Sequence, residues 1–115
     1  MTTETQNALS AKGLYRYHDV IGLLSAAGPG FSGPVSVVTG PQNELYVANR
    51  ANAKQTEAVR ITRCTKEGDF LEHFGEWGEG SGEFIWVTAI AFSPGWELFL
   101  ADEDTNRISV FDSEN

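Results

Sequence analysis

The sequence is poor in several features that mark common kinds of site or location. It has one cysteine, Cys64, which excludes an internal disulfide, and one thiol with two separated histidines is too little for a structural zinc site. No apolar run approaches the roughly 20 residues that a membrane helix requires, and residues 1–13 are too polar for a secretory signal. We therefore expect a cytoplasmic protein with no cofactor and no membrane association.

Basic residues are scarce in the second half of the chain. Residues 1–66 contain seven Lys and Arg against four Asp and Glu, a net charge of +3, whereas residues 67–115 contain twelve acidic residues and one basic residue, a net charge of −11. Binding to nucleic acid depends on basic side chains that neutralise phosphates, so this distribution argues against a nucleic-acid partner. The 115 residues, 41% of them apolar, are enough for one compact unit.

The chain contains an internal repeat. Residues 31–49 align with residues 84–102 with five of nineteen positions identical, and Arg60-Ile-Thr then matches Arg107-Ile-Ser. The first connection is six residues longer than the second, which predicts a longer loop over residues 51–59. A repeat of this length is typical of architectures in which one structural unit stacks on the next.

Each copy of the repeat predicts a series of short strands separated by turn residues. The first copy has four, over residues 35–39, 44–49, 60–65 and 70–74, and the second has three, over residues 88–93, 97–102 and 107–112. Residues 15–24 precede Phe31 as residues 70–74 precede Phe84, which predicts a fourth strand without its first three. The predicted strand order is D, then ABCD, then ABC.

Several motifs carry a family resemblance. They are Gly-Glu-Phe at 82–84, Leu-Phe-Leu-Ala-Asp at 98–102, Asn-Arg-Ile-Ser-Val-Phe-Asp at 106–112 and Gly-Asp-Phe-Leu-Glu-His-Phe-Gly at 68–75. They resemble the blades of NHL-repeat six-bladed β-propellers over residues 15–115, about two blades. The resemblance implies an all-β fold of four-stranded antiparallel blades. The expected segments are a flexible lead at 1–13 and one propeller segment at 14–115. Within the propeller segment we expect a lone D strand at 14–27, a full blade at 28–78 and a three-stranded blade at 79–115.

Two blades alone would leave apolar faces in water, because each blade buries its faces against its neighbours. Two interpretations meet this difficulty. The sequence is part of a longer propeller, or three copies associate as a homotrimer in which six blades close a ring.

Four residues at the strand ends are predicted to be structural. Asp102, Asp104 and Asn106 alternate as in the opening of a calcium loop, but Arg107 stands where such a loop requires glycine. We therefore expect Asp102 to pair with Arg107 inside its blade, and Asn49 to form hydrogen bonds near Arg60.

No catalytic or metal-binding residue is predicted. The two histidines, His18 and His73, fall on outer D strands, and Cys64 has no partner base and is expected to be inert. The loop over residues 75–83 has three glutamates and no lysine, so it is predicted to link blades and not to bind phosphate. We expect a non-catalytic binding or scaffolding module. The alternative is a lyase-like propeller enzyme whose catalytic residues lie in other blades.

The resemblance also implies a binding face, because the D-to-A and B-to-C connections of such propellers gather on one side. The candidate residues there are Arg50, Asn52, Lys54, Trp77, Trp86, Glu103 and Asp104. With the glutamates of the linking loop counted, this face is more acidic than basic. It therefore favours a protein, a peptide or a cationic small molecule over RNA.

Overall fold

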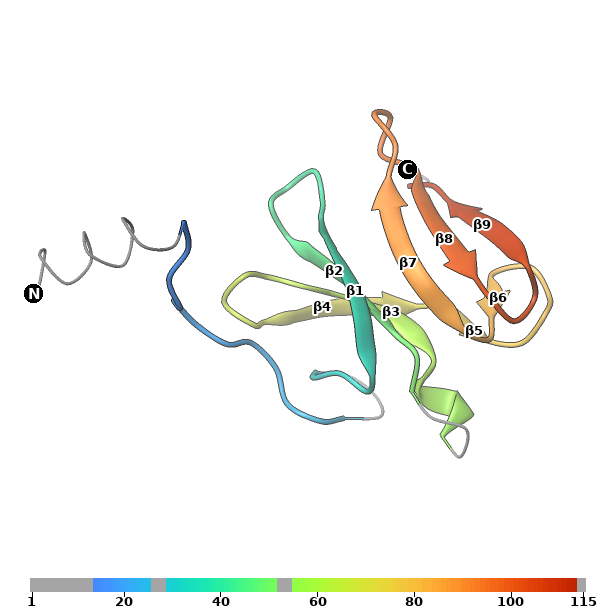
Figure 1. Ribbon diagram of the computed structural model, residues 1–115, viewed down its shortest axis with the longest axis horizontal. Helices are drawn as coiled ribbons and strands as arrows, with labels where there is room; N and C mark the ends of the chain where they lie inside the picture. The colour runs from blue at the N-terminus through green and yellow to red at the C-terminus, as the bar shows by residue number, and fades with distance from the viewer. Residues whose placement is uncertain (1–13, 26–28, 52–54, 114–115) are drawn as a thin grey trace, which may run out of the picture.

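The computed structural model describes residues 14–25, 29–51 and 55–113, and the part of the chain that it describes is built from two antiparallel sheets (Figure 1). The first sheet has the order β1 (Pro34–Thr39), β2 (Leu45–Asn49), β3 (Arg60–Cys64) and β4 (Phe70–Phe74). The second has the order β7 (Val87–Phe92), β8 (Leu98–Asp102) and β9 (Arg107–Phe111). The expected all-β architecture of blade-like sheets is confirmed, with each of these strands within one residue of its predicted bounds.

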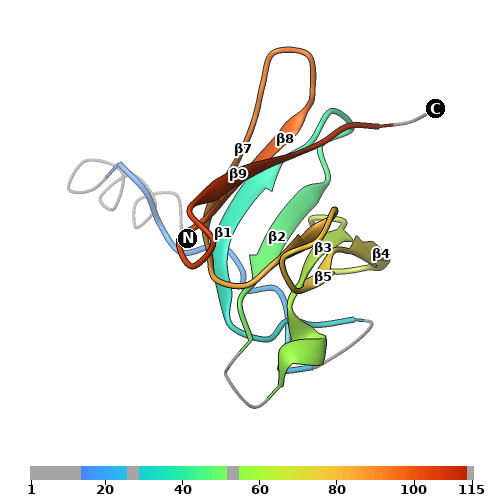
Figure 2. The same ribbon diagram turned by 90° about the vertical axis from the view of Figure 1, so that its right-hand side faces the viewer.

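Two short elements accompany the sheets. The segment between β4 and β7 forms a parallel pair, β5 (Glu76–Trp77) with β6 (Glu83–Phe84), which the sequence did not predict. The predicted long loop after β2 contains a single 3-10 turn, η1 (Thr56–Ala58). The tips of the β1–β2 and β7–β8 hairpins lie at one end of the molecule and η1 lies at the other (Figures 1 and 2).

The two sheets repeat each other residue by residue. Val37 faces Val47 in the first sheet, and the equivalent residues Ile90 and Leu100 face each other in the second. The first hairpin of each sheet, β1–β2 or β7–β8, also has a shift of register near its start. The shift lies between Pro34 and Ser36 in the first sheet and between Val87 and Ala89 in the second. The hairpin turns agree as well, since Asn43 and Trp96 occupy the same turn position with φ values of 67° and 66°. The internal repeat of the sequence is therefore a repeat of structure.

The hydrophobic core lies between the sheets. Its buried members come from β2, β3, β7 and β8 and from the segments beside them: Ala48, Val59, Ile61, Phe84, Val87, Ile90, Leu98 and Leu100. Strand β1 lies against β7, and the edge-to-face pair of Tyr46 and Phe92, with ring centroids 5.0 Å apart, extends the contact. One face of the first sheet thus packs on one face of the second.

Residues 14–23 form no strand, in contrast with the expectation for residues 15–24. A strand needs a partner edge to receive its backbone hydrogen bonds, and no edge in the described residues pairs with this segment. Leu24 makes one parallel bridge to Phe31, which is the counterpart of the bridge from Trp77 to Phe84. The predicted flexible lead at residues 1–13 lies outside the described residues.

A glycine next to the phenylalanine ring recurs at the start of each copy. Gly22 has φ of 113° and a Cβ there would lie 2.5 Å from the ring of Phe31, while Gly75 has φ of 91° and a Cβ there would lie 2.5 Å from the ring of Phe84. No other residue allows both the left-handed backbone and the close approach.

We predict that Gly75→Ala destabilises the fold far more than Gly82→Ala. Gly82 also has a positive φ, 76°, but a Cβ there meets nothing within 4 Å, so its substitution costs only the backbone strain of about 1–2 kcal/mol. Gly75→Ala adds a clash with the fully buried Phe84, an overpacking cost of about 1–3 kcal/mol. Urea denaturation of the two variants measures the difference, and equal losses would contradict the close packing of Gly75 on Phe84.

Candidate binding face

Arg50 and Trp86 join the two sheets at the end of the molecule where η1 lies. The Arg50 guanidinium lies over the Trp86 ring, 4.2 Å from its centroid, and Arg50 Nε donates a hydrogen bond of 3.1 Å to the Val87 carbonyl. The Arg50 backbone N–H donates to the Gly33 carbonyl at 2.8 Å. Trp86 remains 39% exposed, so it presents an aromatic surface whose position is fixed by the stacked Arg50 guanidinium.

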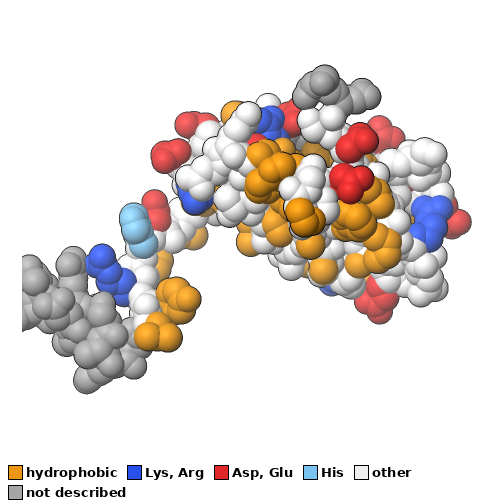
Figure 3. Space-filling view, turned by 90° about the horizontal axis from the view of Figure 1, so that it is seen from above, with side chains coloured by type: hydrophobic (Ala, Val, Ile, Leu, Met, Phe, Trp, Pro, Cys, Tyr) orange, Lys and Arg blue, Asp and Glu red, His pale blue; other side chains and the backbone are white. Residues whose placement is uncertain are grey.

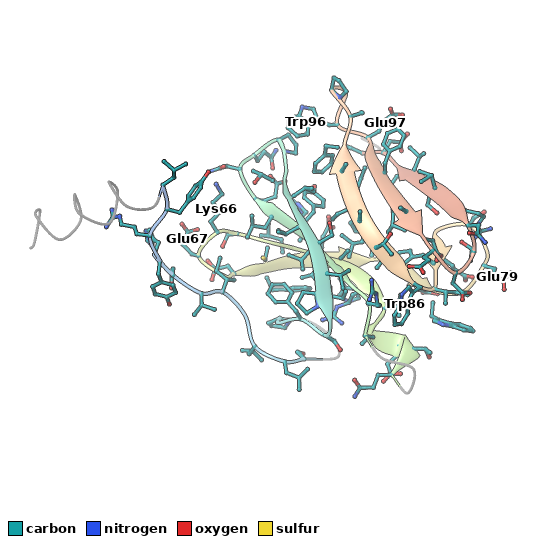
Figure 4. All side chains as sticks on the ribbon, viewed as in Figure 1. Lys66, Glu67, Glu79, Trp86, Trp96 and Glu97 are labelled. Carbon is teal, nitrogen blue, oxygen red and sulfur yellow. The ribbon has the colours of Figure 1, made fainter. Side chains whose placement is uncertain are left out.

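Two carboxylates lie on the β8–β9 connection beside this stack. The backbone N–H of Glu103 donates to the Trp86 carbonyl at 3.0 Å, and that of Asp104 donates to Asp102 Oδ1 at 3.0 Å. Both Glu103 and Asp104 are exposed. Four predicted binding residues, Arg50, Trp86, Glu103 and Asp104, are therefore gathered on one patch, which we call the Trp86 patch; Trp86 is labelled in Figure 4.

Trp77 lies in a separate feature at the same end. It is half-exposed and lines a hollow of about 520 Å³ between η1 and the segment after β4. The other lining residues are Thr56, Glu57, Val59, Arg60, His73, Phe74, Gly75 and Glu76. The remaining predicted binding residues, Asn52 and Lys54, lie outside the described residues.

Asp102 has a structural role, but its partner differs from the expected one. Its carboxylate accepts backbone N–H hydrogen bonds from Ile85 (2.8 Å), Trp86 (3.0 Å), Asp104 (3.0 Å) and Thr105 (3.3 Å). Burial raises its pKa, but these hydrogen bonds outweigh burial and the net pKa is lowered. The salt bridges within the described residues do not join Asp102 to Arg107, whose side chain is exposed; this expected pair is wrong because backbone donors occupy the carboxylate.

Asn49 holds the equivalent position in the first sheet. Its Oδ1 accepts from the Ser32 backbone N–H at 2.9 Å, and its Nδ2 donates to the carbonyls of Val47 and Arg60, each at 3.2 Å, and to Thr62 Oγ1 at 2.9 Å. The expected hydrogen bonding of Asn49 near Arg60 is confirmed.

Arg60, in β3, forms hydrogen bonds with the segment that precedes β1. Its side chain is buried, with Nη1 donating to the Ala58 carbonyl at 3.1 Å and Nη2 to the carbonyls of Ser25 and Gly30, each at 3.3 Å. Burial lowers the pKa of Arg60. The residue therefore fixes the path of the chain into β1 and is not presented to a ligand.

The thiol and the two histidines lie on three different segments of the chain. Cys64 is buried, and burial raises the pKa of its thiol, which disfavours the reactive thiolate. His73 lies on β4 and His18 on the strandless N-terminal segment. Within the described ranges no three His, Cys, Asp or Glu side chains gather as a metal site would require. No helix of the same ranges is long and apolar enough to cross a membrane.

A groove of about 850 Å³ lies at the opposite end of the molecule, between the sheets, and no sequence motif indicated it. At its wall Arg63 forms salt bridges with Glu44 (3.3 Å) and Glu72 (3.1 Å). Burial raises the pKa of Glu44, but hydrogen bonds from its own and the Gln42 backbone N–H and from Arg63 lower it on balance. Trp96 lies at this end (Figure 4), and apolar side chains gather there with acidic ones beside them (Figure 3). The residues that line the groove come from six strands and the turns beside them, so linear motifs could not reveal it.

No model of a protein family matches the sequence, and no curated protein is similar to it.

We predict that Asp102→Asn makes the stability of the protein less sensitive to acid. Because the pKa of Asp102 is lowered on folding, its contribution is present above the unfolded-state pKa, about 4, and is lost as the pH falls through the folded-state pKa. At neutral pH the variant should lose about 1–3 kcal/mol, since one amide oxygen cannot replace the carboxylate as acceptor for all four N–H groups. Urea denaturation between pH 2.5 and 7 measures both effects, and parallel curves would rule out this role for Asp102.

Proposed function

We propose that the chain is a non-catalytic binding module of the NHL-repeat propeller type that recognises a cationic segment of a protein or peptide at the Trp86 patch. The observation that carries the proposal is the half-exposed Trp86 ring, stacked on Arg50 at 4.2 Å and adjoined by the exposed Glu103 and Asp104. Aromatic residues with fixed positions are frequent anchors of protein interfaces.

The charges of the patch favour a basic partner. The Arg50 guanidinium is turned onto the ring and its Nε is used by the Val87 carbonyl, whereas the two carboxylates extend into solvent. The net charge of −11 over residues 67–115 adds a long-range attraction for cations. A lysine or arginine side chain between a carboxylate and the indole gains both an ion pair and contact with the ring.

We predict that a hexapeptide of arginine, lysine and one tyrosine binds the full chain, and that its counterpart with glutamate in place of the basic residues does not. Isothermal titration at 50 and 300 mM NaCl should show weaker binding at the higher salt, because screening reduces the attraction of the exposed carboxylates. Trp86→Ala should weaken binding at least about tenfold, as expected for an anchor residue.

Two further variants separate this site from other acidic surface. The double variant Glu103→Gln and Asp104→Asn should weaken binding and flatten its salt dependence. Trp96→Ala, at the opposite end of the molecule, is the matched control and should leave binding unchanged. Equal binding of both peptides, or equal losses for Trp86→Ala and Trp96→Ala, would overturn the proposed site.

A further inference from the structure

In the described residues, one face of each sheet packs on the other sheet, and the opposite face, which we call its open face, has no sheet against it. Ile61 in β3 is 0% exposed, but Ile108, its equivalent in β9, is 61% exposed. Conversely, Ile90 in β7 is 5% exposed while Val37, its equivalent in β1, is 57% exposed. At these two positions of the repeat the residue is buried where another sheet covers it and exposed where none does. Val47, opposite Val37 on the open face of the first sheet, is 6% exposed, so that face is covered in part.

The two open faces are counterparts of the two faces that already pack together. Phe99 and Ile108 on the open face of the second sheet are equivalent to Tyr46 and Ile61, which face the core. Val37 on the open face of the first sheet is equivalent to the core residue Ile90. The contact between the sheets can therefore be repeated between the second sheet of one copy and the first sheet of another.

The second sheet also lacks a fourth strand. In the first sheet β4 pairs with β3, whereas in the described residues no strand pairs with the outer edge of β9. Residues 17–21 precede Gly22 as β4 precedes Gly75, and both segments then make the parallel bridge to phenylalanine. The segment nevertheless pairs with no strand in the described residues (Figure 1), and Tyr17 is 80% and Val20 76% exposed, whereas Ile21 lies beside Gly68 in the β3–β4 turn.

We propose that residues 17–21 of one copy form the fourth strand on β9 of the next copy, and that the open faces of the two copies close in the same step. The pairing of β3 with β4 gives the register, since β9 is equivalent to β3. The expected antiparallel pairs are Tyr17 with Phe111, Asp19 with Val110, Val20 with Ser109 and Ile21 with Ile108.

This register is chemically complementary. It places one aromatic pair, Tyr17 with Phe111, and one apolar pair, Ile21 with Ile108. In the first sheet the next pair is Thr65 with Asp69, in which the Thr65 backbone N–H donates to the Asp69 carbonyl. The equivalent pair between copies is Asp112 with Arg16. Opposite charges and aromatic pairs across strands stabilise a sheet. The groove of about 850 Å³, lined in part by Phe111 and Asp112, leaves room for the Tyr17 ring at this edge.

The strand pairing and the face packing require the same arrangement of copies. A second sheet completed by a neighbour's residues 17–21 turns its open face toward the first sheet of that neighbour, as the first sheet turns toward the second within one chain. The acidic half of one copy, with a net charge of −11 over residues 67–115, then meets the half with a net charge of +3 in the next. The contact is head-to-tail and closes into a ring. Three copies supply six sheets.

A cysteine pair tests the register directly in the full chain. Val20→Cys with Ser109→Cys joins two positions whose Cα atoms would be about 5 Å apart, within disulfide range. After mild oxidation, non-reducing electrophoresis should show covalent oligomers. Val20→Cys with Val110→Cys is the matched control, because a shift of one residue points the two side chains to opposite faces. Cross-linking of the control pair alone, or of neither pair, would overturn the proposal.

Light scattering over a concentration series tests the assembly independently. The wild-type chain should reach about three times its mass of 12.6 kDa. Ile108→Lys should reduce the mass to that of one chain without loss of the β-sheet circular dichroism, because Ile108 is exposed in the single chain. Trp77→Lys, a similarly exposed site away from both open faces, should leave the assembly intact. A wild-type chain that stays monomeric at 0.1 mM would overturn the proposal.

Discussion

The structure depends on one constraint, that a blade-like sheet has two apolar faces and needs a neighbour on each. The core between the two sheets satisfies half of this requirement, and the exposed fractions of Ile61 (0%) and Ile108 (61%) show what remains. The sequence cannot distinguish these two isoleucines, since each lies in the same position of the same motif. Their difference arises only from position along the stack, as expected for a repeat in which each unit contacts its neighbours.

Polar residues at the ends of β2 and β8 hold the linking segments to the sheets. Asn49 and Asp102 are equivalent, and each accepts a hydrogen bond from the backbone N–H of the residue that follows a packed phenylalanine, Ser32 or Ile85. A buried backbone donor in a link must find an acceptor, and a short side chain at a strand end supplies it. Asparagine also donates three hydrogen bonds at its site, whereas the aspartate accepts three more, so the two residues are not interchangeable.

The repeat in the sequence was sufficient to predict the seven strands of the two sheets, because two aligned copies give the register of one another. The strand expected at residues 15–24 did not form, since a strand also requires a partner edge and in the described residues no edge pairs with this segment. The hydrogen-bond partners of Asp102 could not be predicted from residue spacing, because its carboxylate accepts hydrogen bonds from backbone N–H groups, which are not part of any sequence motif. The groove with Arg63 was missed for a related reason, as its walls meet only after the sheets pack.

The Trp86 patch lies at positions where the two copies of the repeat differ. The backbone bond from Arg50 N–H to the Gly33 carbonyl corresponds to the bond from Glu103 N–H to the Trp86 carbonyl, so Arg50 is equivalent to Glu103 and Gly33 to Trp86. The fold therefore requires only the backbone at these positions and leaves the side chains free to differ. At a head-to-tail junction Glu103 of one copy would face Gly33 of the next, which has no ring to stack on. The stack of Arg50 on Trp86 thus occurs once in each chain, and an assembly presents as many such patches as it has copies.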